Sequence, residues 1–259
     1  MNHLFYALLF FSVSIYAQEP IEVNFVKNTS LKADTLVLVD NFETVYCIKD
    51  DVFQKKTNGD TITYNNLQLG TLHSVNAFNP LKINLFYKYF NTVIILDNRL
   101  AEIFKIDFNA LPDYKNVTHV STGHDNTIWV FNQDLQQLEL FDYKNTKTRA
   151  QTVPVQSNVL DLTSNYNFCW LLTENYLYVY NYFGSLLKKI KNNGYTELLE
   201  SGSNLILKKD NTLFFMKNNQ DIIQPILTPN LLINQFFVTN ETMYIYNSET
   251  LQEYQLKIK

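Results

Sequence analysis

A repeat of about 40 residues is the feature that most constrains what this chain can fold into. Its clearest copy joins residues 127–131 (TIWVF) to residues 137–141 (QLELF) through a short polar turn. Near the C-terminus, residues 242–246 (TMYIY) and 251–254 (LQEY) follow the same pattern. Runs of β-branched and aromatic residues between polar turns are typical of short antiparallel strands, so each copy is predicted to contain a hairpin.

Four further segments fit this template and raise the number of copies to six. Their paired strands are predicted at residues 45–49 and 52–53, 83–88 and 92–96, 169–172 and 176–178, and 205–208 and 212–214. The turns of the six hairpins are expected at Asp50-Asp51, Phe90-Asn91, Gln133-Asp134, Glu174-Asn175, Asp210-Asn211 and Ser248-Glu249. Outer strands such as residues 103–106 and 222–224 then predict four strands per copy, which is the blade of a β-propeller.

The two ends of the chain are predicted to complete one blade together. The sixth copy ends at Lys259 after its third strand, while residues 21–26 (IEVNFV) have no copy of their own. We expect this N-terminal segment to supply the missing strand, because a closed ring has no exposed edge. The prediction is an all-β fold, a single β-propeller of about six four-stranded blades over residues 18–259. An antiparallel sandwich is the alternative, because sandwiches have similar strand and turn spacing.

The repeat resembles six-bladed propellers of the broad NHL-repeat or YWTD-like kind. The N-terminus and the composition, rich in Asn, Lys and Tyr, also resemble uncharacterised exported propellers of flavobacterial type. Neither a Tyr-Trp-Thr-Asp motif nor a repeated Trp-Asp pair occurs, and Gly123-His124 is interpreted as a turn. The resemblance therefore implies an architecture and leaves the activity open.

The first 17 residues have the features of a secretory signal peptide. An apolar run at residues 4–11 leads to small residues that end at Ala17, and the run is too short to span a bilayer. We expect a mature chain without a transmembrane segment, exported to the periplasm, to the outer membrane or to the cell surface. An uncleaved membrane anchor is the alternative.

Charge and cysteine content narrow the possible partners and cross-links. A formal net charge of −4 with scattered lysines provides no basic surface for phosphates, so nucleic acid is not an expected partner. Cys47 and Cys169 fall in the second strands of the first and fourth copies, which are opposite each other in a six-membered ring. Both are therefore predicted to be unpaired core residues, because a disulfide requires Cα atoms within roughly 7 Å.

The alignment of the copies places one residue of each innermost strand at an equivalent height around the axis. These residues are Val37, Ser74, His119, Asp161, Glu197 and Asn234. Five of the six are polar and could hold a polar ligand or a cation, and whether a metal binds stays open. The alternative is a hydrated channel whose polar groups bind ordered water. No cofactor is predicted.

Sequence motifs of catalysis are absent. There is no Gly-x-Ser-x-Gly elbow, no His-x-x-x-His or Cys-x-x-Cys pair, no phosphate loop and no dinucleotide fingerprint. Enzymatic activity therefore stays undecided, and binding is favoured. We predict a non-catalytic protein-interaction scaffold of the bacterial cell envelope, which holds an envelope or outer-membrane protein through loops of one propeller face.

Two other functions are considered. The first is a metal-dependent hydrolase or lyase that acts in the axial channel through His119, Asp161 and Glu197. The second is a glycan- or peptidoglycan-binding propeller, which would show exposed Tyr and Phe side chains clustered outside the interfaces between blades. Most aromatic residues are instead expected in those interfaces, among them Trp129, Trp170, Phe214 and Tyr244.

Overall fold

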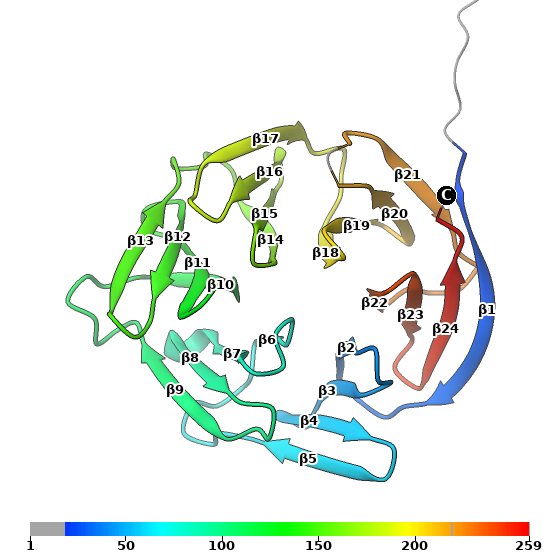
Figure 1. The fold of residues 1–259 in the computed structure, drawn as a ribbon, viewed down its shortest axis with the longest axis horizontal. Helices are drawn as coiled ribbons and strands as arrows, with labels where there is room; N and C mark the ends of the chain where they lie inside the picture. Colours follow the sequence, from blue (N-terminus) through cyan, green and yellow to red (C-terminus); the bar gives the residue numbers. More distant parts are fainter. Residues whose placement is uncertain (1–18, 219, 259) are drawn as a thin grey trace, which may run out of the picture.

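The computed structural model describes residues 19–218 and 220–258, and this part of the chain is an all-β fold. Its sheets stand around a common axis, each with one edge turned inward and one outward, as in a β-propeller (Figure 1). One short 3₁₀ turn at Lys88–Phe90 interrupts the strands of the described residues. The predicted all-β propeller fold is therefore confirmed.

Four sheets have four strands each and follow one another along the chain. The first consists of β2 (Thr35–Val39), β3 (Val45–Lys49), β4 (Val52–Thr57) and β5 (Asp60–Tyr64). The second consists of β6 (Ser74–Asn76), β7 (Ile83–Tyr87), β8 (Thr92–Leu96) and β9 (Glu102–Asp107). The third consists of β10 (Val117–Thr122), β11 (Thr127–Asn132), β12 (Gln137–Asp142) and β13 (Lys147–Gln151). The fourth consists of β14 (Val159–Ser164), β15 (Phe168–Thr173), β16 (Tyr176–Asn181) and β17 (Leu186–Lys191).

The remaining strands form one eight-stranded sheet. One half contains β18 (Glu197–Ser201), β19 (Asn204–Lys209), β20 (Thr212–Met216) and β21 (Ile223–Leu227). The other half contains β22 (Gln235–Thr239), β23 (Thr242–Tyr246), β24 (Thr250–Leu256) and the N-terminal β1 (Ile21–Ser30). The predicted count of six blades depends on dividing this sheet between β21 and β1.

The N-terminal strand closes the ring as predicted. β1 pairs antiparallel with β24 from Val23, opposite Leu256, to Ser30, opposite Thr250. Its first two residues also pair in parallel with β21, where Ile21 lies opposite Ile226. The strand is four residues longer than the predicted segment 21–26, because the pairing with β24 continues to Ser30.

The connecting loops separate the ring into two faces. Each of the four-stranded sheets runs outward strand by strand, so loops between first and second strands share one face and loops between second and third strands share the other. We call the first the mouth face; its loops are residues 40–44, 77–82, 123–126, 165–167, 202–203 and 240–241. The far face carries residues 50–51, 88–91, 133–136, 174–175, 210–211 and 247–249, which include all six predicted hairpin turns.

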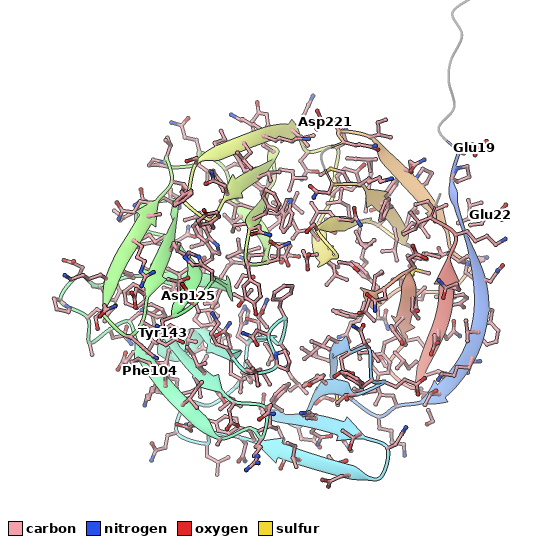
Figure 2. All side chains as sticks on the ribbon, viewed as in Figure 1. Glu19, Glu22, Phe104, Asp125, Tyr143 and Asp221 are labelled. Carbon is pink, nitrogen blue, oxygen red and sulfur yellow. The ribbon has the colours of Figure 1, made fainter. Side chains whose placement is uncertain are left out.

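Apolar side chains fill the interfaces between neighbouring sheets. Trp129 and Leu171 belong to one buried cluster between the third and fourth sheets, and Trp170 belongs to the next cluster. The rings of Phe104 and Tyr143 lie 5.0 Å apart between the second and third sheets (Figure 2). The prediction that large aromatic residues form this core is confirmed for Trp129, Trp170 and Tyr244, which are buried, while Phe214 is partly buried.

Two sequence predictions concern the membrane and the leader. Within residues 19–218 and 220–258, no helix combines the length and the hydropathy needed to cross a membrane. The predicted signal peptide at residues 1–17 lies outside the described residues.

The first prediction concerns the two thiols. Cys47 on β3 and Cys169 on β15 are buried, unpaired and in different sheets, and burial raises the pKa of both. We expect a thiol reagent to find no reactive group in the native protein and two groups after denaturation without reductant. An intramolecular disulfide in the same assay would contradict the strand register.

The second prediction concerns ring closure. Deleting residues 19–30 exposes the edge of β24, and we expect a lower melting temperature and aggregation, because an unpaired edge recruits other chains. Thermal unfolding and light scattering measure both effects. Lys27→Ala is the control, because Lys27 forms surface ion pairs with Glu43 and Glu253 and its loss leaves the strand in place. A monomeric deletion variant with unchanged melting would contradict closure by β1.

Candidate functional site

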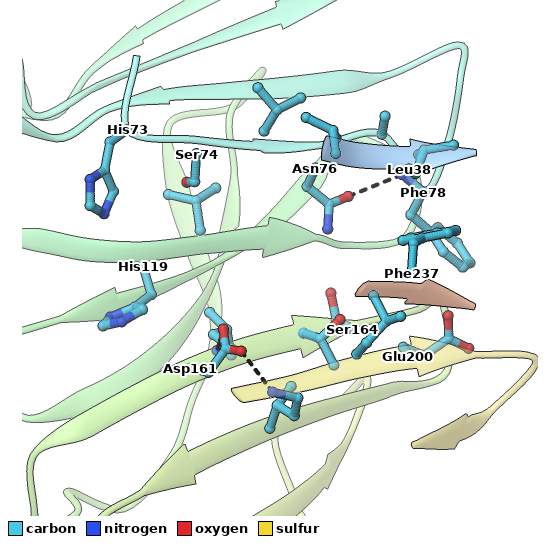
Figure 3. A pocket seen from close by; sticks show the side chains of 18 of the residues that line it. Leu38, His73, Ser74, Asn76, Phe78, His119, Asp161, Ser164, Glu200 and Phe237 are labelled. Atoms are coloured by element: carbon cyan, nitrogen blue, oxygen red, sulfur yellow. Dashed lines mark hydrogen bonds between the residues drawn. The ribbon is translucent and has the colours of Figure 1, made fainter. Parts of the chain in front are cut away.

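The innermost strands enclose a pocket of about 370 Å³ on the axis, which we call the channel pocket. Its two ends differ in chemistry: His73 and His119 lie at one end, and Phe78, Phe237 and Glu200 lie at the other (Figure 3). The second end leads to the mouth face, because Phe78 belongs to the loop that follows β6.

The structure brings together four of the six residues predicted around the channel. Val37, Ser74, His119 and Asp161 all line the channel pocket. The other two lie elsewhere. Glu197 forms an ion pair of 2.6 Å with Lys208, and Asn234 is exposed in the segment before β22.

Asp161 connects two neighbouring sheets. Its Oδ1 accepts a hydrogen bond from the backbone N–H of Leu162 at 2.8 Å, and its Oδ2 accepts one from Leu198 on β18 at 2.8 Å. Burial raises the pKa of this carboxyl to about 6, against the lowering effect of the two N–H donors. The side chain thus has a structural role, although it is partly accessible from the channel.

Small polar residues near the mouth end of the channel form further links between sheets. Asn76 Nδ2 donates to Ser121 Oγ at 3.2 Å, and Ser164 Oγ donates to the same oxygen at 2.7 Å. On the other side of the ring, the backbone N–H of Leu36 donates to Gln235 Oε1 at 2.6 Å. Asn76 and Ser164, which line the channel pocket, therefore also hold the innermost strands together.

Sequence reasoning missed these residues, although a signal was present. Gly123, Asn165 and Gly202 directly follow three of the innermost strands, and each of these strands ends in a short run of small or polar residues. Ser121, Ser164 and Glu200 belong to these runs. The sequence alignment of the copies selected only one residue in each innermost strand, and these residues were not among those selected.

The two histidines of the channel have depressed basicity. Burial lowers the pKa of His119 to about 4, with further effects from Lys88 and His73, and burial also lowers the pKa of His73. Both imidazoles are therefore neutral at pH 7. Within the part of the chain that the structure describes, no group of three or more His, Cys, Asp and Glu side chains is arranged to hold a metal ion.

A second pocket of about 340 Å³ adjoins the channel pocket on the mouth face, and we call it the mouth pocket. The two pockets share Leu38, Ala77, Phe78, Glu200 and Phe237. The mouth pocket also contains Asp40 and Phe42, and Phe42 is 88% exposed.

Aromatic side chains surround this opening outside the interfaces between sheets. Phe78 packs edge to face on Tyr166 with ring centroids 5.1 Å apart, although their loops belong to sheets separated by the third sheet (Figure 1). Outside both pockets, His124 packs in the same way on Tyr182 at 5.4 Å, and Tyr182 contacts Phe183 in the loop between β16 and β17. The mouth face therefore carries a cluster of exposed and half-exposed rings.

Polar contacts hold the mouth-face loops in place. The buried ammonium of Lys82 donates to the carbonyl oxygens of Gly123, Asp125 and Thr127 at 2.7 to 3.0 Å, which fastens the loop of Phe78 to the next sheet. Gly123 has no room for a side chain, because a Cβ would lie 2.4 Å from Thr127 Oγ1. Such anchoring gives the aromatic residues a defined position.

No family model matches the sequence, and no curated protein matches it. Several solved structures have a similar fold. Virginiamycin B lyase from Staphylococcus aureus has a TM-score of 0.59 at 13% identity, over 85% of this chain and 79% of that chain. The WD40 domain of Pan2 from Neurospora crassa has a TM-score of 0.58 at 12% identity, over 88% and 76%.

A chain of the mitotic checkpoint complex has a TM-score of 0.58 at 11% identity, over 97% of this chain and 98% of that chain. At these identities the similarity shows the fold alone. It supports the β-propeller fold derived from the strand order.

The third prediction uses the raised pKa of Asp161. Because the folded state favours the protonated carboxyl, protonation of Asp161 stabilises the fold below pH 4, and this stabilisation is lost as pH rises toward about 6. In Asp161→Asn this dependence disappears, although one backbone N–H loses its acceptor at every pH. We expect the stability difference between wild type and variant to shrink by on the order of 1 kcal/mol from pH 4 to pH 7. Urea denaturation at both pH values measures it, and a constant difference would contradict the assignment.

Proposed function

We propose that this protein is a non-catalytic interaction scaffold of the bacterial cell envelope, a six-bladed propeller of the exported NHL-like or YWTD-like kind. It holds a partner protein through the loops of the mouth face. The observation that carries this proposal is the cluster of exposed aromatic side chains around the mouth pocket, on loops that are anchored to neighbouring sheets. Rigid loops with exposed rings are suited to binding, because little conformational freedom is lost on association.

The channel residues support binding rather than turnover. Asp161, Ser121 and Ser164 are engaged in hydrogen bonds between sheets. Glu197, which the hydrolase or lyase alternative requires, lies outside the channel pocket and pairs with Lys208. A divalent ion that co-purifies with the chain would favour that alternative.

The envelope location rests on the sequence. The apolar run at residues 4–11 and the small residues up to Ala17 favour export, and an envelope or outer-membrane protein is then the expected partner.

A glycan ligand is the second candidate, and the same aromatic cluster favours it. Rings of Phe42, Phe78 and Tyr166 lie outside the interfaces between sheets, which is the arrangement expected for stacking on sugars. The two candidate functions predict different captured molecules: a scaffold should capture a protein from the envelope, and a glycan-binding propeller should capture a glycan.

The fourth prediction tests the mouth face with a matched pair of variants. Phe42 on the mouth face and Tyr89 on the far face are 88% and 87% exposed, so neither Phe42→Ser nor Tyr89→Ser should disturb the fold. We expect affinity purification from the native envelope, followed by mass spectrometry, to recover one partner with wild type and Tyr89→Ser. Its yield should fall about tenfold or more with Phe42→Ser, because exposed aromatic anchors carry much of a binding energy.

Three results would contradict the proposal. They are a partner lost only with Tyr89→Ser, a partner retained by both variants, and recovery of glycan in place of protein. The last result would select the second candidate.

A further inference from the structure

We propose that the mouth pocket, together with the adjoining end of the channel pocket, binds a lysine or arginine side chain from an extended segment of the partner protein. The inference rests on the proposed function and names the chemistry of the contact. It predicts a basic residue next to an apolar or aromatic one in the bound segment.

The charge of the two pockets favours a cation. Three carboxylates line them, from Asp40, Asp161 and Glu200. Every lining residue lies in the described part of the chain, and none of them is lysine or arginine. The histidines at the far end of the channel pocket are neutral at pH 7, because burial lowers their pKa. The pockets therefore attract positive charge and discriminate against carboxylates.

Glu200 is placed to receive this charge. It lines both pockets at the point where they join. Its Oε1 accepts hydrogen bonds from Asn165 Nδ2 at 3.0 Å and from the backbone N–H of Ser203 at 2.7 Å. Among the described residues both bonds use Oε1, which leaves Oε2 available to a guanidinium or ammonium group.

Asp40 adds a second carboxylate at the outer edge of the mouth pocket. Its Oδ1 accepts hydrogen bonds from the backbone N–H groups of Phe42 at 2.8 Å and Thr44 at 2.9 Å. The same loop is joined to the loop of the last sheet, because Asn240 Nδ2 donates to Asn41 Oδ1 at 2.8 Å. The Asp40 carboxylate thus holds the backbone of the turn that carries the exposed Phe42 side chain.

The aromatic residues complete the recognition of a basic side chain. Phe78 and Phe237 line both pockets, so their rings flank the route from the mouth face to Glu200 (Figure 3). Aromatic faces attract cations and also pack on the aliphatic stem of lysine or arginine. A neutral sugar would use the rings and donate hydroxyl hydrogen bonds to the carboxylates, but it has no positive charge to match the negative charge of the pockets, which is why we favour the basic peptide.

The fifth prediction uses defined probes with the purified full chain. Ac-Gly-Phe-Arg-Gly-NH₂ should bind in ligand-observed NMR titration, while Ac-Gly-Phe-Glu-Gly-NH₂ and N-acetylchitotriose should bind about tenfold more weakly or not at all. Glu200→Gln should weaken the arginine peptide about fivefold or more, because it removes the charge and keeps the acceptor for Ser203 and Asn165.

Glu197→Gln is the matched control. It lies on the same strand, three residues away, and faces Lys208 outside both pockets, so binding should be unchanged. Thermal unfolding checks that both variants fold. If Glu200→Gln does not fold, Asp40→Asn replaces it, because an Asn oxygen preserves the turn around Phe42. Weakening by either variant supports the proposal.

Several results would overturn this inference. They are equal binding of the two peptides, no binding of the arginine peptide up to about 10 mM, stronger binding of the sugar, or unchanged affinity in the charge variants. The proposed function fails separately. If Phe42→Ser loses the partner while Glu200→Gln and Asp40→Asn retain it fully, the mouth face is the binding surface and the basic contact is wrong.

Discussion

The whole structure depends on each sheet being packed on both faces. Residues of β11 illustrate the constraint, because Trp129 and Phe131 pack toward the fourth sheet while Ile128 and Val130 pack toward the second. A sheet with two apolar faces cannot stop at a free end of the ring without exposing one of them to water. Closure is therefore a condition of folding, and the chain meets it by giving its N-terminal strand β1 to the sheet that holds its C-terminal strand β24.

Closure has a consequence at the axis. The innermost strands lie with one edge toward the channel, so their polar groups need partners there or water. Ser121, Ser164 and Asp161 meet this need by bonding across to neighbouring sheets. A polar channel is thus what a closed ring of sheets produces, and polarity alone does not indicate catalysis. The exposed aromatic residues of the mouth pocket lie in loops that do not have to pack between two sheets.

The sequence allowed the fold to be predicted far better than the site. Period-two strands and polar turns are local features, so the turn at Asp50-Asp51, where both residues have positive φ, could be located from residue types alone. The position of a residue along the axis depends on where its strand begins, and the sequence does not define these starting points to one residue. β22 begins at Gln235, one residue after Asn234, and on β18 it is Glu200 rather than Glu197 that reaches the channel pocket. The loop residues Phe42 and Phe78 follow no period, and only the assembled ring brings them together.

The two ends of the channel differ in the charge of the residues that line them. At the far end, burial and the Lys88 charge keep His119 neutral, so the imidazoles add no positive charge to the channel. At the mouth end, Glu200 and Asp40 line the mouth pocket together with aromatic rings, and burial raises the pKa of Glu200. The negative charge of the two pockets then comes from Asp40, Glu200 and Asp161, and the neutral imidazoles do not oppose it. A positively charged group that approaches the ring is drawn to the face where anchored loops already hold apolar surface, so charge and shape select the same side of the propeller.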